Sequence, residues 1–166
     1  MSEQLELKNY ILGLSADEVG FCKHNLKAPY NLDLPYAVTV AVKLPDAVLK
    51  TIDGKPTISY FHAYRTANAM LDEIAFKTCR FIEKLGYNAF PIGASQSTAD
   101  DKSSYRGLFS HKIGGRLSGL GFIGKSGLFF SKKYGSIVRL VTVLTDMPLN
   151  AENEVIKNGC VIVIIA

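Results

Sequence analysis

Residues 127–145 read GLFFSKKYGSIVRLVTVLT, and this stretch decides the fold class. Two runs rich in Val, Ile, Leu and Phe, 127–131 and 136–145, are separated by KKYG, in which Gly135 supplies the left-handed residue that a tight turn needs. The pattern predicts two strands joined as a hairpin. Neighbouring antiparallel strands are typical of an α+β domain.

The residues upstream extend this prediction. β-branched side chains fill 36–44, which we expect to be a buried strand, and shorter strands are expected at 18–22 and 87–92. Helices are predicted over 3–14, with Ser2 as the N-cap, and over 59–85, where apolar residues recur every three or four positions and Gly86 ends the helix. The sequence therefore predicts a single α+β domain over 1–166, with a mostly antiparallel central sheet flanked by helices.

The composition is that of a globular protein. The chain has 166 residues, of which 48% are hydrophobic and 20% charged, enough for one domain with a sizeable core. The first residues lack a signal-peptide pattern, and the apolar runs are shorter than a membrane span, so we expect a cytoplasmic protein with no membrane partner. Three widely spaced cysteines form no disulfide framework.

Positive charge is concentrated in one part of the chain. The net charge is +4, and between residues 101 and 140 a single acid, Asp101, faces eight basic residues: Lys102, Arg106, Lys112, Arg116, Lys125, Lys132, Lys133 and Arg139. Such an excess attracts phosphate-bearing ligands or nucleic acid. A solvated basic face is the alternative explanation.

The glycine-rich segment 119–126, GLGFIGKS, fits both G-x-G-x-x-G and the P-loop pattern G-x-x-x-x-G-K-[ST]. Both patterns bind phosphates at the start of a helix, whereas here a predicted strand follows. The context therefore argues against a P-loop. A glycine-dense segment with apolar faces suits a large flat ring system instead, which makes these residues candidates for cofactor binding: Gly119, Leu120, Gly121, Phe122, Ile123, Gly124, Lys125 and Ser126.

Four motifs in order carry a resemblance to a known family: SHK at 110–112, the segment 119–128, YGS at 134–136 and LTDMPL at 144–149. Together they resemble the cobalamin-binding domain of the epoxyqueuosine reductase and reductive dehalogenase group. The resemblance implies a nitroreductase-like α+β domain that binds cobalamin beside a substrate pocket. Tyr60 and His62 match a Tyr–His pair of the family and are further candidates for cofactor binding, although Tyr60 and Tyr64 at helical spacing fit a plain core as well.

The sequence departs from this family at the catalytic acid. Epoxyqueuosine reductase carries an aspartate eight residues before the first glycine of its G-L-G motif, and here that position is His111. Histidine has a near-neutral reference pKa and is able to act as a general acid. Tyr105 is the second candidate, because the resemblance to reductive dehalogenases implies a tyrosine donor. Cys22 and His24 lack the partner pair of a zinc site, so no metal bound by side chains is expected.

The second departure lies at the end of the sequence. Members of the resembled family continue into a ferredoxin-like region whose cysteines hold two iron–sulfur clusters. This chain reads CVIVIIA over 160–166, and Cys160 alone cannot hold a cluster. We expect a domain truncated near Cys160, without the ferredoxin-like part and its clusters.

The expected function is a truncated cobalamin-binding domain of an iron–sulfur and cobalamin-dependent reductase. One alternative is a non-catalytic binding or homodimerisation module, and another is a flavin- or nucleotide-binding protein. A tRNA partner is expected only if the substrate is of the epoxyqueuosine type. Whether this chain is itself an enzyme is left open, because it lacks the clusters that would supply electrons.

Overall fold

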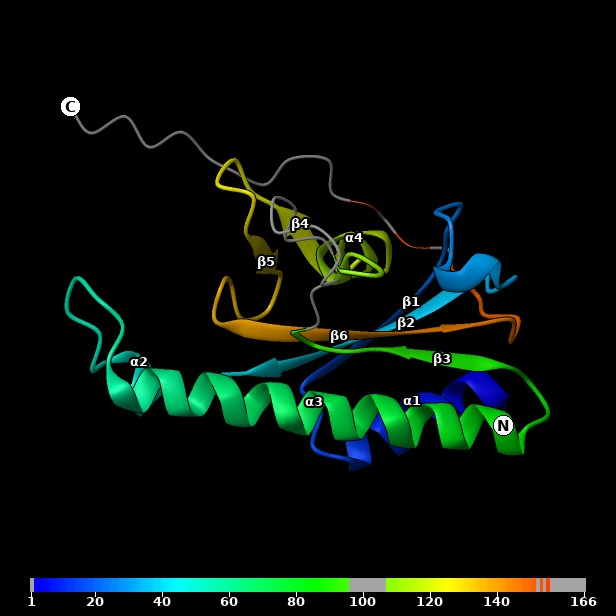
Figure 1. Cartoon of the computed structure of the whole chain (residues 1–166), viewed down its shortest axis with the longest axis horizontal. Coiled ribbons are helices and arrows are strands. Elements are labelled where there is room, and N and C mark those ends of the chain that lie inside the picture. Colours follow the sequence, from blue (N-terminus) through cyan, green and yellow to red (C-terminus); the bar gives the residue numbers. More distant parts are fainter. Residues whose placement is uncertain (1, 96–106, 152, 154, 156–166) are drawn as a thin grey trace.

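The computed structural model describes residues 2–95, 107–151, 153 and 155. Its centre is a four-stranded sheet in the order β1-β2-β6-β3, in which every neighbouring pair is antiparallel. These strands are β1 (Glu18–Lys23), β2 (Tyr36–Lys43), β6 (Val138–Thr145) and β3 (Ala89–Ile92). Helices cover the sheet, as Figure 1 shows, so the predicted α+β class with an antiparallel sheet is confirmed.

Helices α1 (Glu3–Gly13) and α3 (Ile58–Lys84) pack on one face of the sheet (Figure 1). The strands present valines to this face at every second position, as the two-residue period of a strand requires. The shared core consists of Val38, Val40, Val42, Val141, Val143, Leu71, Ile74 and Ile82. Both helix ends follow the predicted signals: the Ser2 side chain accepts a hydrogen bond from the Leu5 amide, and Gly86 after α3 has φ of 90°.

The opposite face of the sheet is covered by α4 (His111–Leu117) and the two-stranded β4 (Gly121–Ile123) and β5 (Phe129–Ser131) (Figure 1). Here β2 presents small side chains, Ala37, Thr39 and Ala41, between its valines. A Cβ on Gly114 would lie 2.5 Å from Thr39 Oγ1, so only glycine lets α4 approach this closely. Because both faces are covered, most residues of β2 and β6 are buried, and most of them are apolar.

The predicted hairpin between residues 127–131 and 136–145 is wrong. Strand β5 pairs with β4 in a separate small sheet, and β6 pairs with β2 and β3. The turn itself forms as expected, with Gly135 at φ of 65° and a bridge between Ser131 and Gly135. Along its whole length β6 pairs with β2, and over residues 142–145 it also pairs with β3, while β5 takes β4 as its partner. Residues 110–126, which precede these strands and are rich in glycine, contain α4 and β4, and neither element was predicted from the sequence.

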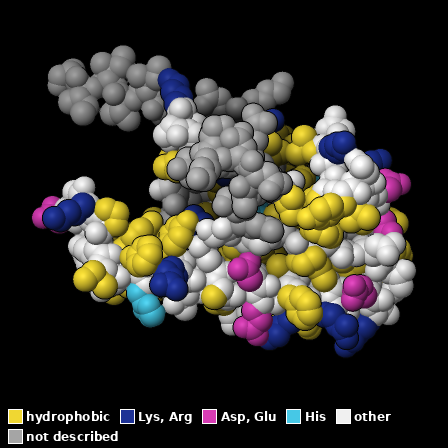
Figure 2. All heavy atoms as spheres, viewed as in Figure 1, with side chains coloured by type: hydrophobic (Ala, Val, Ile, Leu, Met, Phe, Trp, Pro, Cys, Tyr) yellow, Lys and Arg dark blue, Asp and Glu magenta, His cyan; other side chains and the backbone are white. Residues whose placement is uncertain are grey.

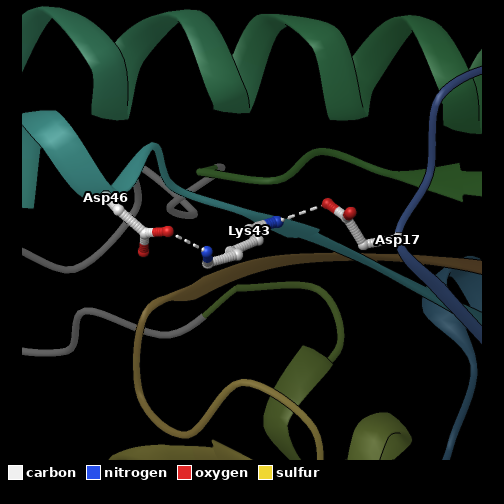
Figure 3. Close-up of polar contacts among 3 residues, drawn as sticks. All are labelled: Asp17, Lys43 and Asp46. Atoms are coloured by element: carbon white, nitrogen blue, oxygen red, sulfur yellow. Dashed lines mark hydrogen bonds and ion pairs between the residues drawn. The ribbon is translucent and has the colours of Figure 1, made fainter.

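Lys43 connects three elements at the end of β2 (Figure 3). Its backbone N–H donates a 2.7 Å hydrogen bond to Asp17 before β1, and its ammonium group lies 2.6 Å from Asp46 Oδ2. Asp46 begins the short helix α2 (Asp46–Leu49). These contacts hold α2 against the end of the sheet, where a cavity opens.

Two further short elements complete the description. A 3-10 turn, η1 (Pro29–Asn31), follows β1. After β6, the Asp146 carboxylate of the LTDMPL motif accepts hydrogen bonds from the backbone and side-chain nitrogens of Asn88, which fixes the entry into β3. In the described part of the chain, each helix is too short or too polar to cross a bilayer.

Candidate functional site

A cavity of about 600 Å³ lies at the start of β6, and side chains from three separate elements meet there. Tyr60 from the first turn of α3, His111 from the first turn of α4 and Arg139 from β6 line it. Most of the remaining wall is apolar and includes Leu44, Leu49, Ile52, Leu128, Phe129 and Leu140. Among the described residues, no Asp or Glu lines it. The cavity is therefore an apolar space with a few polar groups, which is the usual character of a small-molecule site.

The His111 ring is fixed by hydrogen bonds at both nitrogens. Its Nε2 lies 3.0 Å from the Gly93 carbonyl oxygen and its Nδ1 lies 3.0 Å from Thr142 Oγ1. A carbonyl oxygen only accepts, so Nε2 carries the proton, and the Thr142 hydroxyl donates to Nδ1 of the neutral ring. Burial is the main cause that lowers the pKa of His111, opposed by the hydrogen bond to Gly93. His111 is thus a neutral imidazole of one tautomer that joins α4 to β6 and to the end of β3.

Arg139 is held in place by α3. Its Nε donates a 3.0 Å hydrogen bond to the side-chain oxygen of buried Asn68, and its guanidinium carbon lies 4.1 Å from the centre of the Tyr64 ring. The Tyr60 ring follows, 6.4 Å from that of Tyr64. Residues 60, 64 and 68 are spaced by four and share one face of the helix. This polar stripe on α3 meets the start of β6 and places the guanidinium at the cavity.

The predicted glycine segment lies beside the cavity and does not line it. A Cβ on Gly121 would collide with the Phe130 carbonyl and the Phe129 ring, and Gly119 has φ of 72°. Protein packing at Gly121 and a turn at Gly119 thus account for the absence of a side chain at these two positions, so these two glycines are not themselves evidence for a macrocycle. Gly124 forms a turn with Leu128, and a strand follows, which agrees with the argument against a P-loop.

The structure unites some of the predicted site residues. Tyr60 and His111 line the same cavity, and Leu128 and Phe129, just after the glycine segment, join them. His62 is exposed on α3 and lies outside the cavity. Tyr105 and Cys160 are outside the described residues. Within the described ranges, no group of three His, Cys, Asp or Glu side chains lies close enough together to hold a metal ion.

Sequence reasoning did not single out Asn68 and Thr142, and it counted Arg139 only as one of eight basic residues. The sequence does contain a signal for these residues. Arg139 and Thr142 are polar residues within the otherwise apolar run 138–144, and Asn68 lies one helical turn after Tyr64. The segment 138–145 is buried on both faces, so a polar residue within it needs a partner. That partner comes from another element and is not visible in the local pattern.

No model of a known protein family matches the sequence, and no curated protein matches it. Solved structures do match. A reductive dehalogenase described as B12-dependent superposes with a TM-score of 0.75 at 18% identity, covering 90% of this chain and 21% of that one. An epoxyqueuosine reductase in complex with a modified tRNA-Tyr stem loop gives 0.63 at 17% identity, covering 94% and 48%. The Bacillus subtilis epoxyqueuosine reductase gives 0.63 at 16% identity, with the same coverage.

This chain thus spans about a fifth of the dehalogenase and about half of the two epoxyqueuosine reductases. The motifs that resemble this group in the sequence lie on a backbone of the same architecture, with an antiparallel sheet between helices. The chain therefore has the fold shared by the B12-dependent reductive dehalogenase and epoxyqueuosine reductase structures.

Proposed function

We propose that this chain is the cobalamin-binding domain of a cobalamin-dependent reductase, and that cofactor and substrate meet at the cavity beside Tyr60 and His111. The observation that carries the proposal is that these two side chains, singled out from separate motifs far apart in the sequence, line one cavity. The structural likeness to a B12-dependent dehalogenase over 90% of the chain supports it.

The residues around the cavity fit part of a corrinoid. The walls are mainly apolar, and the rim carries exposed apolar side chains, Leu128 at 57% and Ile52 at 39%. A corrinoid with its nucleotide tail is larger than this cavity, so one part of it would be enclosed and the rest would lie against the rim. Tyr60, Leu128 and Phe129 would hold it. Bound cobalamin supplies a cobalt ion that can be reduced, which no side chain provides.

Within this proposal His111 is the candidate for moving a proton at the cavity. Thr142 and the Gly93 carbonyl hold its ring in one orientation. Burial favours the neutral ring, so donation from the imidazolium form requires that His111 first take up a proton and loosen one of these contacts. Activity that depends on this proton should fall as the pH rises.

Electrons would have to come from outside this sequence. Two of the three cysteines, Cys22 and Cys79, are buried in different parts of the core, whereas an iron–sulfur cluster usually needs four cysteine ligands close together. Turnover by this chain is expected only with an added reductant. A tRNA partner belongs to the proposal only for a substrate of the epoxyqueuosine type.

The test is a titration of the chain with hydroxocobalamin, FMN and ATP, followed by absorbance changes for the first two and by calorimetry for ATP. We expect binding of hydroxocobalamin alone. Leu128→Glu places a charge on the apolar rim and should weaken binding at least tenfold. Phe76→Glu is the matched control, since Phe76 is 62% exposed on α3 and does not line the cavity.

The absence of hydroxocobalamin binding would overturn the proposal, as would tighter binding of FMN or ATP. Equal weakening by Leu128→Glu and Phe76→Glu would show that the corrinoid does not bind at this cavity.

A further inference from the structure

We infer that the cavity binds an apolar organic molecule through a single carboxylate group, and that Arg139 is the residue that recognises it. Under the proposed function this molecule is the substrate, and only its role as substrate rests on that proposal. Binding of the carboxylate itself follows from the arrangement around Arg139.

The Arg139 guanidinium is positioned without being neutralised. Asn68 accepts the hydrogen bond from Nε, and Tyr64 packs against the planar face, which together fix the direction of the group. Of the five N–H donors of an arginine, the Asn68 contact uses one. Among the described residues no carboxylate forms an ion pair with Arg139.

The surroundings of Arg139 favour an anion. No acidic side chain from the described residues lines the cavity, while Lys112 does, with its ammonium group bonded 2.8 Å away to the Gly127 carbonyl. His111 adds no negative charge, and Asp72 on α3 already accepts a hydrogen bond from the Ala94 amide. A half-buried guanidinium between apolar walls is costly to leave without a counter-charge.

The shape and composition of the cavity narrow the class of ligand. The fork of an arginine matches a carboxylate, to which it donates two parallel hydrogen bonds. The apolar walls formed by Leu44, Leu49, Leu128 and Leu140 suit an uncharged body. A nucleotide would bring several phosphate charges, but the glycine segment beside the cavity does not open a helix that could receive them.

The test uses 2-naphthoate and its neutral analogue 2-naphthamide, added to the full chain without cobalamin. The fluorescence of both probes can be followed because the chain contains no tryptophan. We expect naphthoate to bind and naphthamide to bind at least tenfold more weakly. Arg139→Gln should reduce naphthoate binding at least tenfold and bring it to the level of naphthamide.

Two further variants make the test specific. Arg65→Gln is the matched control, because Arg65 is an exposed arginine on α3 that packs on Phe61 outside the cavity, and it should leave binding unchanged. Ser136→Glu adds a negative charge at an exposed position of the cavity wall and keeps Arg139 in place. Ser136→Glu should weaken naphthoate binding and leave naphthamide binding unchanged. This variant tests the inference even if the Arg139→Gln chain does not fold.

Equal affinity for the two probes would overturn the inference, as would unchanged naphthoate binding in folded Arg139→Gln or in Ser136→Glu. The hydroxocobalamin titration is separate. A chain that binds naphthoate through Arg139 but no corrinoid would overturn the proposed function and leave the carboxylate site standing, and the reverse result would overturn only the carboxylate site.

Discussion

The guanidinium carbon of Arg139 lies 4.1 Å from the centre of the Tyr64 ring, at the point where α3 crosses the start of β6. A cation over an aromatic face is attracted by the electrons of the ring. The contact joins the long helix to a central strand beside the cavity that Arg139 lines, so the packing of α3 and the geometry of the site depend on the same pair.

The hydrogen bond that completes this arrangement can be removed at Asn68. Asn68→Ala takes away the acceptor of the Arg139 Nε–H. Loss of a hydrogen bond to a charged group should lower the free energy of unfolding by about 1–3 kcal/mol. Urea denaturation measures this, with Thr66→Ala at an exposed position of the same helix as the control. Equal effects of the two substitutions would contradict the role given to Asn68.

The buried His111 makes stability depend on pH. Its pKa is lowered by burial, so between that value and about 6.5, the reference pKa of histidine, the unfolded chain binds more protons than the folded one. The stabilising contribution is therefore complete above about pH 6.5 and is lost as the pH falls toward the lowered pKa.

His111→Gln should flatten this dependence when denaturation is followed as a function of pH. His24 also has a pKa lowered by burial but is present in both proteins, so the difference between their curves isolates His111. If the two proteins lose stability in parallel on acidification, His111 does not titrate as described.

A substitution at Gly121 tests whether protein packing or contact with a ligand requires a glycine at this position. Gly121→Ala places a methyl group against the Phe130 carbonyl and the Phe129 ring. We expect a loss of about 1–3 kcal/mol in the free energy of unfolding without any cofactor present. Gly13→Ala is the control, since nothing lies within 4 Å of the added Cβ there. If the Gly121→Ala protein were as stable as the original chain and lost only corrinoid binding, contact with the cofactor would be the reason for a glycine at this position.

The buried thiols should be unreactive in the folded protein. Burial raises the pKa of Cys22 to about 11 and that of Cys79 to about 12, so little thiolate forms near neutral pH. In a Cys160→Ser chain, Ellman's reagent at pH 8 should modify both slowly when folded and rapidly in urea. Rapid modification of the folded chain would contradict their burial.

Much of the fold could be predicted because its signals are local. The valine-rich strands, the Ser2 cap and the glycines at 86 and 135 each act within a few residues, and the structure has each of them. The pairing of β5 could not be predicted in the same way. Residues 127–145 look like a hairpin by themselves, but β6 takes its partners from distant β2 and β3.

Part of the candidate site could also be inferred from the sequence. The motifs identified Tyr60 and His111, and the cavity contains both. They gave no role to Asn68 or Thr142, whose importance depends on what they contact across the fold. His62 was predicted from the sequence to bind the cofactor but lies outside the cavity. Two positions along an α-helix are about 200° apart around its axis, so His62 and Tyr60 lie on different faces of α3.

By itself, the sequence determined the α+β class, the main helices and strands and the motifs that resemble a cobalamin-binding domain, because propensity, periodicity and turn chemistry act over short stretches of chain. Only the tertiary structure decided which strands pair, why Gly114 and Gly121 must be glycine, and that Arg139 stands beside His111 at one cavity. Those features depend on contacts between residues far apart in the sequence. The free energy of such contacts is determined by burial, close packing and the pairing of charges, none of which can be read from a short stretch of chain.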